Sequence, residues 1–432
     1  MLKYLQQIWN SKDLRKKILF TVLILVTFRL MGQITIPGAD VNALQAIFNK
    51  NQLLGMFSLL TGGSAHNFSI ILMGLSPYIN ASIIIQLLTV IIPRLENISK
   101  EGQQGQRKLN QYTRWLSLPL AFLQSYGMIL ILNSQSPVPI LQNISSPAVI
   151  LPVMLTVTTG TVLLMWLAEL ITEYGIGNGS SMIIFAGIIA SIPETIGQSL
   201  ALSQQSSDKL IPFVIMILIT LALTITVILV TEAQRNIPVS YAGRGGRGAN
   251  EHSSLPIRIN QAGMVPIIFA VSLITFPGIL AQFFQNSTIG WLKNMASFIA
   301  TYFQSNSIPY VITYFILVIA FTFFYVGITF NPEQVAENIQ KRGGYIPGIR
   351  PGKQTAEYLA GISNRLNLFG GLFIAFIAVS PIVIQMISSR LSFGSVPTII
   401  TGAGLIIIVG VVLEVIRSIN AQLVMHDYNK LY

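Results

Sequence analysis

The stretch GMFSLLTGGSAHNFSIILMGLSPYINASIIIQLL, residues Gly55–Leu88, decides the fold of this chain. It starts with an apolar run that is too short to cross a bilayer and breaks at Thr61–Ser64, and it resumes as an apolar segment of full membrane-spanning length. The second segment carries Ser76, Asn80 and Gln86, polar side chains that are unfavourable in lipid. A short apolar run that is interrupted by glycines and followed by a span containing polar residues is typical of the wall of a cavity or pore.

The composition of the whole chain indicates a polytopic membrane protein. Of the 432 residues, 52% are hydrophobic and only 9% are charged, whereas a soluble protein carries about 25% charged residues. The net charge of +11 comes from basic residues that lie between apolar segments, which favours membrane topology over nucleic-acid binding. The chain contains no cysteine, which excludes disulfides, thiolate catalysis and cysteine-bound metals.

Ten apolar segments are long enough to cross a membrane, at about 20 residues per crossing. They are expected near 18–36, 68–92, 115–133, 149–171, 178–196, 210–231, 262–284, 308–330, 366–387 and 396–416. An even number of spans places both termini on one side, and the loops of that side hold most of the 26 Lys and Arg. The positive-inside rule therefore predicts that both termini are cytoplasmic. The expected fold is an all-α polytopic membrane protein.

Two cytoplasmic loops are long and rich in turns. The loop near 331–365 opens with Asn331-Pro-Glu, which predicts a helix start, and its Gly-Gly and Pro-Gly pairs predict turns at 343–344, 347–348 and 351–352. The loop near 232–261 has two proline-bounded arms and a glycine-rich tip. Structured loops add nothing to the stability of spans in the bilayer, so we interpret both as docking surfaces. The alternative is that they are solvated connectors.

The sequence does not support catalysis or metal binding. Its three histidines lie in separate regions without metal-ligand spacing, and the TGGS run at Thr61–Ser64 lacks the lysine of a phosphate-binding loop. The acidic residues near the membrane lie at the ends of spans, whereas pumps and proton-coupled carriers usually need them near the midplane. We therefore expect a chain with no enzymatic activity, no cofactor and no metal.

The polar residues within the spans are neutral amides. They are Asn80, Gln86, Gln124, Asn260 and Gln261. Such side chains join helices through hydrogen bonds of about 0.6–2 kcal/mol each, which is weak enough for the helices to separate. Two interpretations stay open: these amides are packing contacts of the bundle, or they belong to a gate that opens sideways.

The second span has polar residues on two faces. At 100° per residue, Leu75, Ile79 and Gln86 share one arc, whereas Ser76 and Asn80 lie on another. One face can line an aqueous path, in which Leu and Ile would form a hydrophobic constriction. Ordinary core packing is the competing account.

Seven stretches, in the same order along the chain, resemble the SecY/Sec61-alpha family, the channel-forming subunits of the Sec protein translocase. They are ITIPG at 34–38, PYINASIIIQLL at 77–88, KEG…RKLNQYTR at 100–114, ITEYGIGNGSSMIIFAGI at 171–188, LPIRINQAGMVPIIFA at 255–270, FNPEQVAENI at 330–339 and GGYIPGIRPGKQTAEYL at 343–359. The resemblance implies a protein-conducting channel. Its ten transmembrane helices would form two pseudo-symmetric halves, 1–204 and 205–432, around a central hourglass pore with a plug helix.

The resemblance also implies a role for particular residues. A plug near 55–68 would seal the resting channel with Met56, Phe57, Leu59, Leu60, Gly62 and Gly63. A pore ring would consist of Leu75, Ile79, Ser180, Ile184, Ile268 and Ile407. A lateral gate would consist of Asn80, Gln86, Gln124, Asn260 and Phe276. Docking contacts would come from Arg244, Arg247, Arg350 and Lys353. The family pattern GNGIS reads GNGSS here, so at Ser180 either a neighbouring apolar residue substitutes or the ring depends more on its plug.

The partners implied by the resemblance are the SecE and SecG subunits, the SecA motor ATPase and the ribosome. Secretory preproteins and signal sequences would be the clients, membrane lipid would receive released transmembrane segments, and a homodimer is left open. We expect the plasma (inner) membrane of a bacterium, with a thylakoid membrane as the second choice. The rivals are a secondary transporter of small solutes and a lipid- or ion-conducting channel. The first needs a coupling site and the second a charged or carbonyl-lined filter, and the sequence shows neither.

Overall fold

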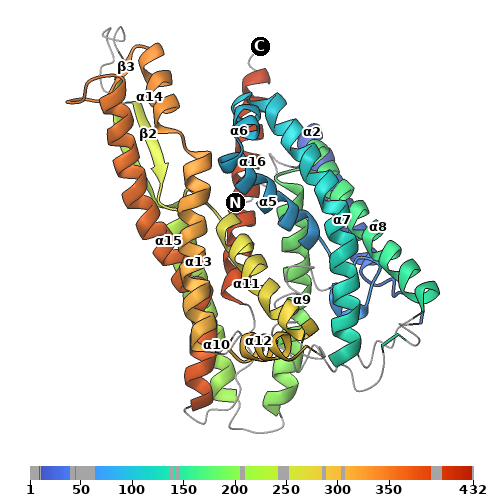
Figure 1. The fold of residues 1–432 in the computed structure, drawn as a ribbon. Helices are drawn as coiled ribbons and strands as arrows, with labels where there is room; N and C mark the ends of the chain where they lie inside the picture. Colours follow the sequence, from blue (N-terminus) through green and yellow to red (C-terminus); the bar gives the residue numbers. More distant parts are fainter. Residues whose placement is uncertain are drawn as a thin grey trace. The chain divides into compact units, whose positions relative to one another are not determined.

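The computed structural model describes residues 9, 11–38, 44, 64–135, 140–141, 146–204, 210–241, 253–284, 289–302, 307–390 and 401–430. Helices dominate this part of the chain (Figure 1). Seven of its helices are long and apolar enough to cross a membrane. An eighth candidate is the pair α5 (Ser76–Ile91) and α6 (Pro93–Lys100), which is bent by 103° at the break between the two helices.

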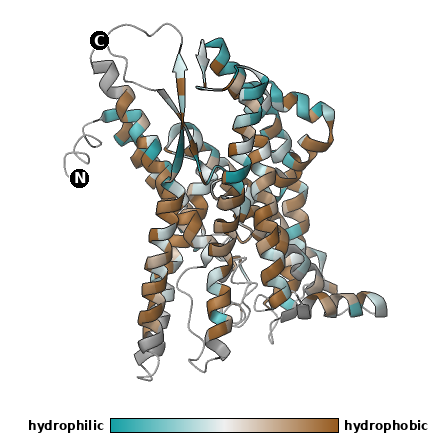
Figure 2. Cartoon of the chain, turned by 90° about the vertical axis from the view of Figure 1, so that its left-hand side faces the viewer, coloured by the Kyte–Doolittle hydropathy of each residue, from teal (hydrophilic) through white to brown (hydrophobic). Residues whose placement is uncertain are grey.

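Each of the ten segments that were expected to cross the membrane overlaps with a helix in residue range. In chain order these helices are α2 (Lys12–Met31), α5, α7 (Gln103–Gln135), α8 (Pro147–Tyr174), α9 (Gly179–Gln204), α10 (Leu210–Glu232), α11 (Val265–Phe284), α13 (Ile308–Thr329), α15 (Lys353–Arg390) and α16 (Gly402–Lys430). Figure 2 shows hydrophobic residues along most of the length of the helices and hydrophilic residues mainly towards one of their ends. The predicted helical, polytopic membrane fold is confirmed.

The chain divides into two compact units. Unit 1 comprises Met1–Gln205, Val271–Tyr310 and Val411–Tyr432, and unit 2 comprises Ser206–Ala270 and Val311–Gly410. Helix α11 begins in unit 2 and continues in unit 1. The expected division into halves at residue 204 stays a prediction.

The helix of the second span begins later than its hydropathy indicates. After the short 3₁₀ helix η1 (Ser64–Asn67), the chain forms turns up to Leu75, and Phe68 and Gly74 have φ angles of 45° and 53°. Helix α5 starts only at Ser76, with Pro77 in its first turn, where a missing N–H costs no hydrogen bond. Hydropathy does not register this break because Gly74 lies within an apolar run, Ile70 to Leu75.

One apolar core of unit 1 is formed by these turns and the helices next to them. Ala65, Phe68 and Leu72 are fully buried there in a cluster to which α7 and α8 contribute. Helix α8 approaches the turns closely at Gly160, where a β-carbon would lie 2.0 Å from the carbonyl oxygen of Ile70. Only glycine permits this approach between a helix and the backbone of another segment.

The loop between α10 and α11 in unit 2 forms a β-hairpin. Strand β1 (Gln234–Tyr241) pairs antiparallel with β2 (Ser253–Arg258), from Gln234↔Arg258 to Val239↔Ser253, and β3 (Gly344–Tyr345) pairs with the end of β1. The sequence interpretation expected two arms here and did not foresee that they pair as strands. The prolines at 238 and 256 argue against strands, although the alternation of buried Ile237 and Val239 is the signal that would have indicated one.

The two long loops of unit 2 share one apolar core. It is formed by Ile237, Val239, Ile257, Ile339, Ile346, Leu359 and Ile362. Helix α14 (Pro332–Lys341) contributes to it and starts as predicted, because Asn331 Oδ1 accepts hydrogen bonds from the backbone N–H groups of Glu333 and Gln334 at 3.1 and 3.2 Å. The predicted turns are also present, with positive φ at Gly343, Gly348 and Gly352. These loops are therefore a folded surface.

Helix α15 projects beyond its predicted span. It has 38 residues, or about 57 Å at 1.5 Å per residue, whereas the hydrocarbon core of a bilayer is about 30 Å thick. Its first turns, with Leu359 and Ile362, belong to the core of the two loops. The same rigid helix therefore joins the folded loops to a membrane span.

Candidate functional site

A polar cavity of about 680 Å³ lies in unit 1 among α5, α7, α8 and α9. Its lining includes two basic and two acidic side chains together with neutral polar ones: Tyr78, Arg107, Asn110, Gln111, Arg114, Met165, Ala168, Glu169, Thr172, Glu173, Asn178 and Ser180. Since both signs of charge occur, the cavity favours neither anions nor cations overall. A cavity of this character can hold water next to the apolar spans.

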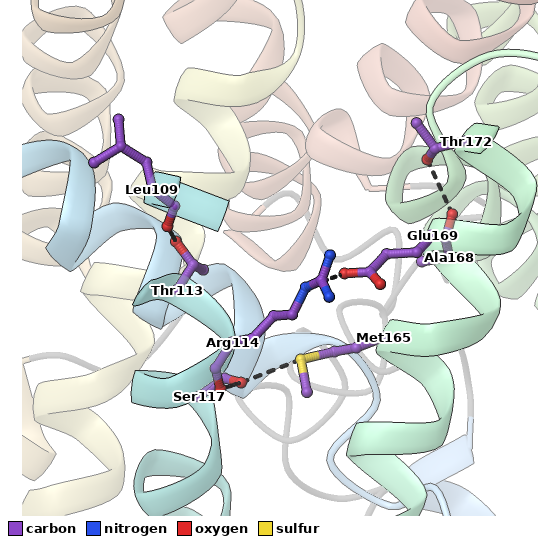
Figure 3. A network of polar contacts seen from close by, with 8 residues as sticks. All are labelled: Leu109, Thr113, Arg114, Ser117, Met165, Ala168, Glu169 and Thr172. Carbon is purple, nitrogen blue, oxygen red and sulfur yellow. Dashed lines mark hydrogen bonds and ion pairs between the residues drawn. The ribbon is translucent and has the colours of Figure 1, made fainter. Parts of the chain in front are cut away.

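An ion pair crosses the wall of this cavity. Arg114 Nε of α7 lies 2.5 Å from Glu169 Oε1 of α8, as Figure 3 shows. One turn further along α7, Ser117 Oγ contacts Met165 Sδ at 3.2 Å. The two charged side chains are 50% and 36% exposed, so the pair contributes only about 0.2–1 kcal/mol to stability. Its main effect is to keep two charges at the edge of the cavity.

The sequence interpretation missed this pair. It noted Glu169 only as an acid at the end of a span and Arg114 only as part of a motif. A signal was available, because consecutive spans are antiparallel neighbours. A basic residue at the start of one span and an acidic residue at the end of the next therefore lie at the same level.

Ser180, the polar member of the predicted pore ring, lines the same cavity. Its hydroxyl group donates to Asn178 Oδ1 at 2.7 Å, and the same oxygen accepts from the backbone N–H groups of Ser180 and Ser181 at 3.1 and 3.3 Å. Asn178 thus caps the start of α9 and also binds the hydroxyl group of Ser180. The hydroxyl group of Ser180 therefore has a hydrogen-bond partner within the cap of its own helix.

The other predicted ring residues are all buried. Leu75, Ile79 and Ile184 are 1%, 7% and 3% exposed in unit 1, and Ile268 and Ile407 are 7% and 4% exposed in unit 2. Their apolar character and burial suit a constriction as well as ordinary packing. The ring stays a prediction.

One predicted gate residue forms a contact between two spans. The hydroxyl group of Ser272 in α11 donates a hydrogen bond to Asn80 Oδ1 in α5. Both residues belong to unit 1. The contact is neutral, so it holds the helices together without the desolvation penalty of a buried ion pair.

The other predicted gate residues have different surroundings. Gln86 Nε2 donates to Ser82 Oγ of its own helix at 3.2 Å, whereas the Oε1 atoms of Gln86 and Gln124 are buried without a hydrogen-bond partner in the described part of the chain. Asn260 Oδ1 accepts from the N–H of Gly263 at 2.8 Å and shapes the turn before α11. Phe276 lies on α11, and its side chain is outside the described residues.

The predicted plug residues, Met56, Phe57, Leu59, Leu60, Gly62 and Gly63, lie outside the described residues, as do Arg244 and Arg247. The other two predicted docking residues, Arg350 and Lys353, are both exposed. Arg350 lies between the positive-φ turns at Gly348 and Gly352, and its carbonyl oxygen accepts from Thr355 Oγ1 at 2.9 Å. The backbone under the Arg350 side chain is therefore held in place. Among the described residues, no group of three or more His, Asp or Glu could hold a metal ion.

Comparison with known proteins gives consistent results. The family model described as SecY matches residues 69–416. The chain is 41% identical over 450 residues to the protein translocase subunit SecY of Streptomyces coelicolor, and the match covers 99% of both chains.

Solved structures show the same fold. One, described as the structure of a protein conducting channel, has a TM-score of 0.66 at 19% identity and covers 94% of this chain and 92% of its own. Another, described as Sec61 in the canine ribosome-channel complex from the endoplasmic reticulum, has a TM-score of 0.60 at 19% identity and the same coverage. At such low identity, the likeness establishes the fold.

Proposed function

Because this chain belongs to the SecY family, we propose that it forms a protein-conducting channel through which unfolded secretory polypeptides cross the membrane. Transmembrane segments would leave the same channel sideways into lipid. The observation that carries this proposal is the identity of 41% with a translocase subunit along 99% of both chains. A channel of this kind catalyses no covalent reaction. It lowers the barrier for moving a polar chain across about 30 Å of hydrocarbon by offering a hydrated path.

The polar features found in the structure support a hydrated path with a weak lateral gate. The cavity beside Arg114 and Glu169 gives polar surface next to the spans, and the bond between Asn80 and Ser272 joins α5 to α11 without charge. A secondary transporter, the alternative, is not favoured. It would need an ionisable coupling group near the midplane, whereas this ion pair lies at the ends of its two spans.

The protein is a multi-pass membrane protein of the Sec translocase. We place it in the plasma membrane of a bacterium with both termini cytoplasmic, supported by the concentration of Lys and Arg in the loops of that side. SecE and SecG would be its fellow subunits, and SecA or a ribosome would drive translocation. The ribosome is supported by the structural relative that was solved in a ribosome-channel complex. The segment near 55–68 would act as the plug, and 1–204 and 205–432 as the two halves.

The proposed function is tested by reconstituting the chain with its small subunits into vesicles and adding the motor ATPase, ATP and a presecretory protein. We expect the presecretory protein to become protected from added protease inside the vesicles. Vesicles that lack the chain are the control. Vesicles that instead accumulate a small solute, with no protected protein, would support the transporter and contradict the proposal.

Replacing Ser272 by alanine should make the gate easier to open. The substitution removes the hydrogen bond to Asn80, which is worth about 1 kcal/mol or roughly a fivefold change in the equilibrium between closed and open states. Presecretory proteins with weakened signal sequences should therefore be translocated several-fold faster, as measured by protease protection.

The matched control for that gate variant is Thr275→Val on the same helix. Within the described part of the chain, the Thr275 hydroxyl group bonds only to the carbonyl oxygen of Val271 in its own helix, at 2.6 Å, so this variant should behave as the unmodified chain. If both variants change translocation equally, the bond between α5 and α11 does not restrain the gate.

A further inference from the structure

A short amphipathic helix, α12 (Gly290–Tyr302, GWLKNMASFIATY), follows α11 in unit 1. At 100° per residue, Trp291, Met295 and Phe298 fall on one arc of this helix, and Lys293 and Ser297 fall on the opposite side. The 13 residues span about 20 Å at 1.5 Å per residue, which is too short to cross a bilayer. Helix α12 is therefore amphipathic but too short to be a membrane span.

The side chains on the apolar arc of α12 are exposed. Trp291, Met295 and Phe298 are 65%, 53% and 58% exposed, whereas Ala296, about 100° further round the helix than Met295, is 3% exposed. Within the described side chains of α12, Ala296 is the only buried one. The helix thus rests on the protein along the side of Ala296, where Leu292 and Ile299 are half-buried, and presents Trp291, Met295 and Phe298 outward. Exposed tryptophan, methionine and phenylalanine on one side of a helix indicate a surface that is covered by lipid or by another protein.

Short connections keep α12 close to the membrane surface. Helix α11 ends at Phe284 and α13 begins at Ile308, so each end of α12 is joined to an apolar helix by only a few residues, and α13 is long enough to cross a membrane. A connection of five residues reaches at most about 18 Å, and that reach holds α12 near the surface at which α11 ends. Figure 1 shows α12 lying across the direction of α9, a span of the same unit.

The chemistry of α12 fits lipid better than water or protein. Tryptophan is enriched where hydrocarbon meets headgroups, and an amphipathic helix in the plane of the interface buries its apolar face by about 5–10 Å. Lys293 is the one charged residue of the helix, and its position on the polar side suits the phosphates of the headgroups. We propose that α12 lies in the lipid interface at the end of α11 with Trp291, Met295 and Phe298 inserted into the hydrocarbon edge. Such an anchor holds the end of α11 at a fixed depth.

Spin labelling at a single introduced cysteine tests this placement. No native cysteine has to be removed first, because the chain contains none. Met295→Cys and its matched control Lys293→Cys carry a nitroxide on opposite sides of the same helix in the full chain, reconstituted into phosphatidylcholine vesicles. Collisions are measured with oxygen, which is concentrated in lipid, and with a water-soluble nickel complex. We expect the ratio of oxygen to nickel collisions to be about tenfold higher at position 295 than at position 293.

Two outcomes would overturn the lipid placement of α12. Frequent nickel collisions at position 295 would place the apolar arc in water, and few collisions with either reagent would mean that protein covers it. Labels at Trp291→Cys and Ser297→Cys form a second pair on the same two sides, so a single variant that fails to fold does not decide the result. This test does not depend on translocation activity.

Discussion

Replacing Arg350 by glutamate should abolish most translocation driven by the motor ATPase. Arg350 is exposed between two glycine turns on a loop whose backbone is held by the Thr355 hydroxyl group, and the core shared by the two long loops lies beneath it. A rigid, exposed arginine is a typical centre of a binding surface, and its loss costs about 2 kcal/mol or more. The protease-protection assay should therefore show a loss of roughly 30-fold at limiting motor concentration.

The matched control for this charge reversal is Arg342→Glu. Arg342 is also exposed and follows α14 in the same loop. The Arg342→Glu substitution therefore changes the net charge of the loop by the same amount as Arg350→Glu. We expect an effect of less than about threefold, because a charge at the rim of an interface mainly alters the association rate. Full activity of the Arg350 variant would refute the docking assignment. Equal losses in both variants would show that only the total charge of the loop matters.

Replacing Gly160 by alanine should strongly destabilise unit 1. The new β-carbon would lie 2.0 Å from the carbonyl oxygen of Ile70, and a backbone atom cannot move aside as the end of a side chain can. Overpacking of this kind costs about 1–3 kcal/mol or more, which exceeds the gain of about 1 kcal/mol from replacing glycine in a helix. We expect the midpoint of thermal unfolding in detergent to fall by several degrees.

Gly127→Ala is the matched control for this packing variant. Gly127 lies within α7, and a β-carbon there would meet no atom within 4 Å. This variant should keep or raise the midpoint of thermal unfolding, because only the helix-forming gain of about 1 kcal/mol applies. A midpoint for Gly160→Ala equal to that of the control would show that α8 does not pack against the turns before α5.

The candidate site was only partly predictable from the sequence. Asn80 could be singled out because an amide in the middle of an apolar span is conspicuous, but nothing in the sequence indicated that its partner would be Ser272. Arg114 and Glu169 illustrate the same difficulty. Each is unremarkable at the end of its own span, and only their approach to 2.5 Å makes them a feature of the cavity.

The sequence alone determined the spans, the capped start of α14 at Asn331 and the glycine turns of the same loop. These features depend on hydropathy, on side-chain caps and on positive φ angles, all of which act within a few residues of the chain. Only the tertiary structure decided the pairing of β1 with β3, the approach of α8 at Gly160 and the bond between Asn80 and Ser272. Each of these joins segments that are distant along the chain, and the free energy of such a contact depends on geometry that no local pattern specifies.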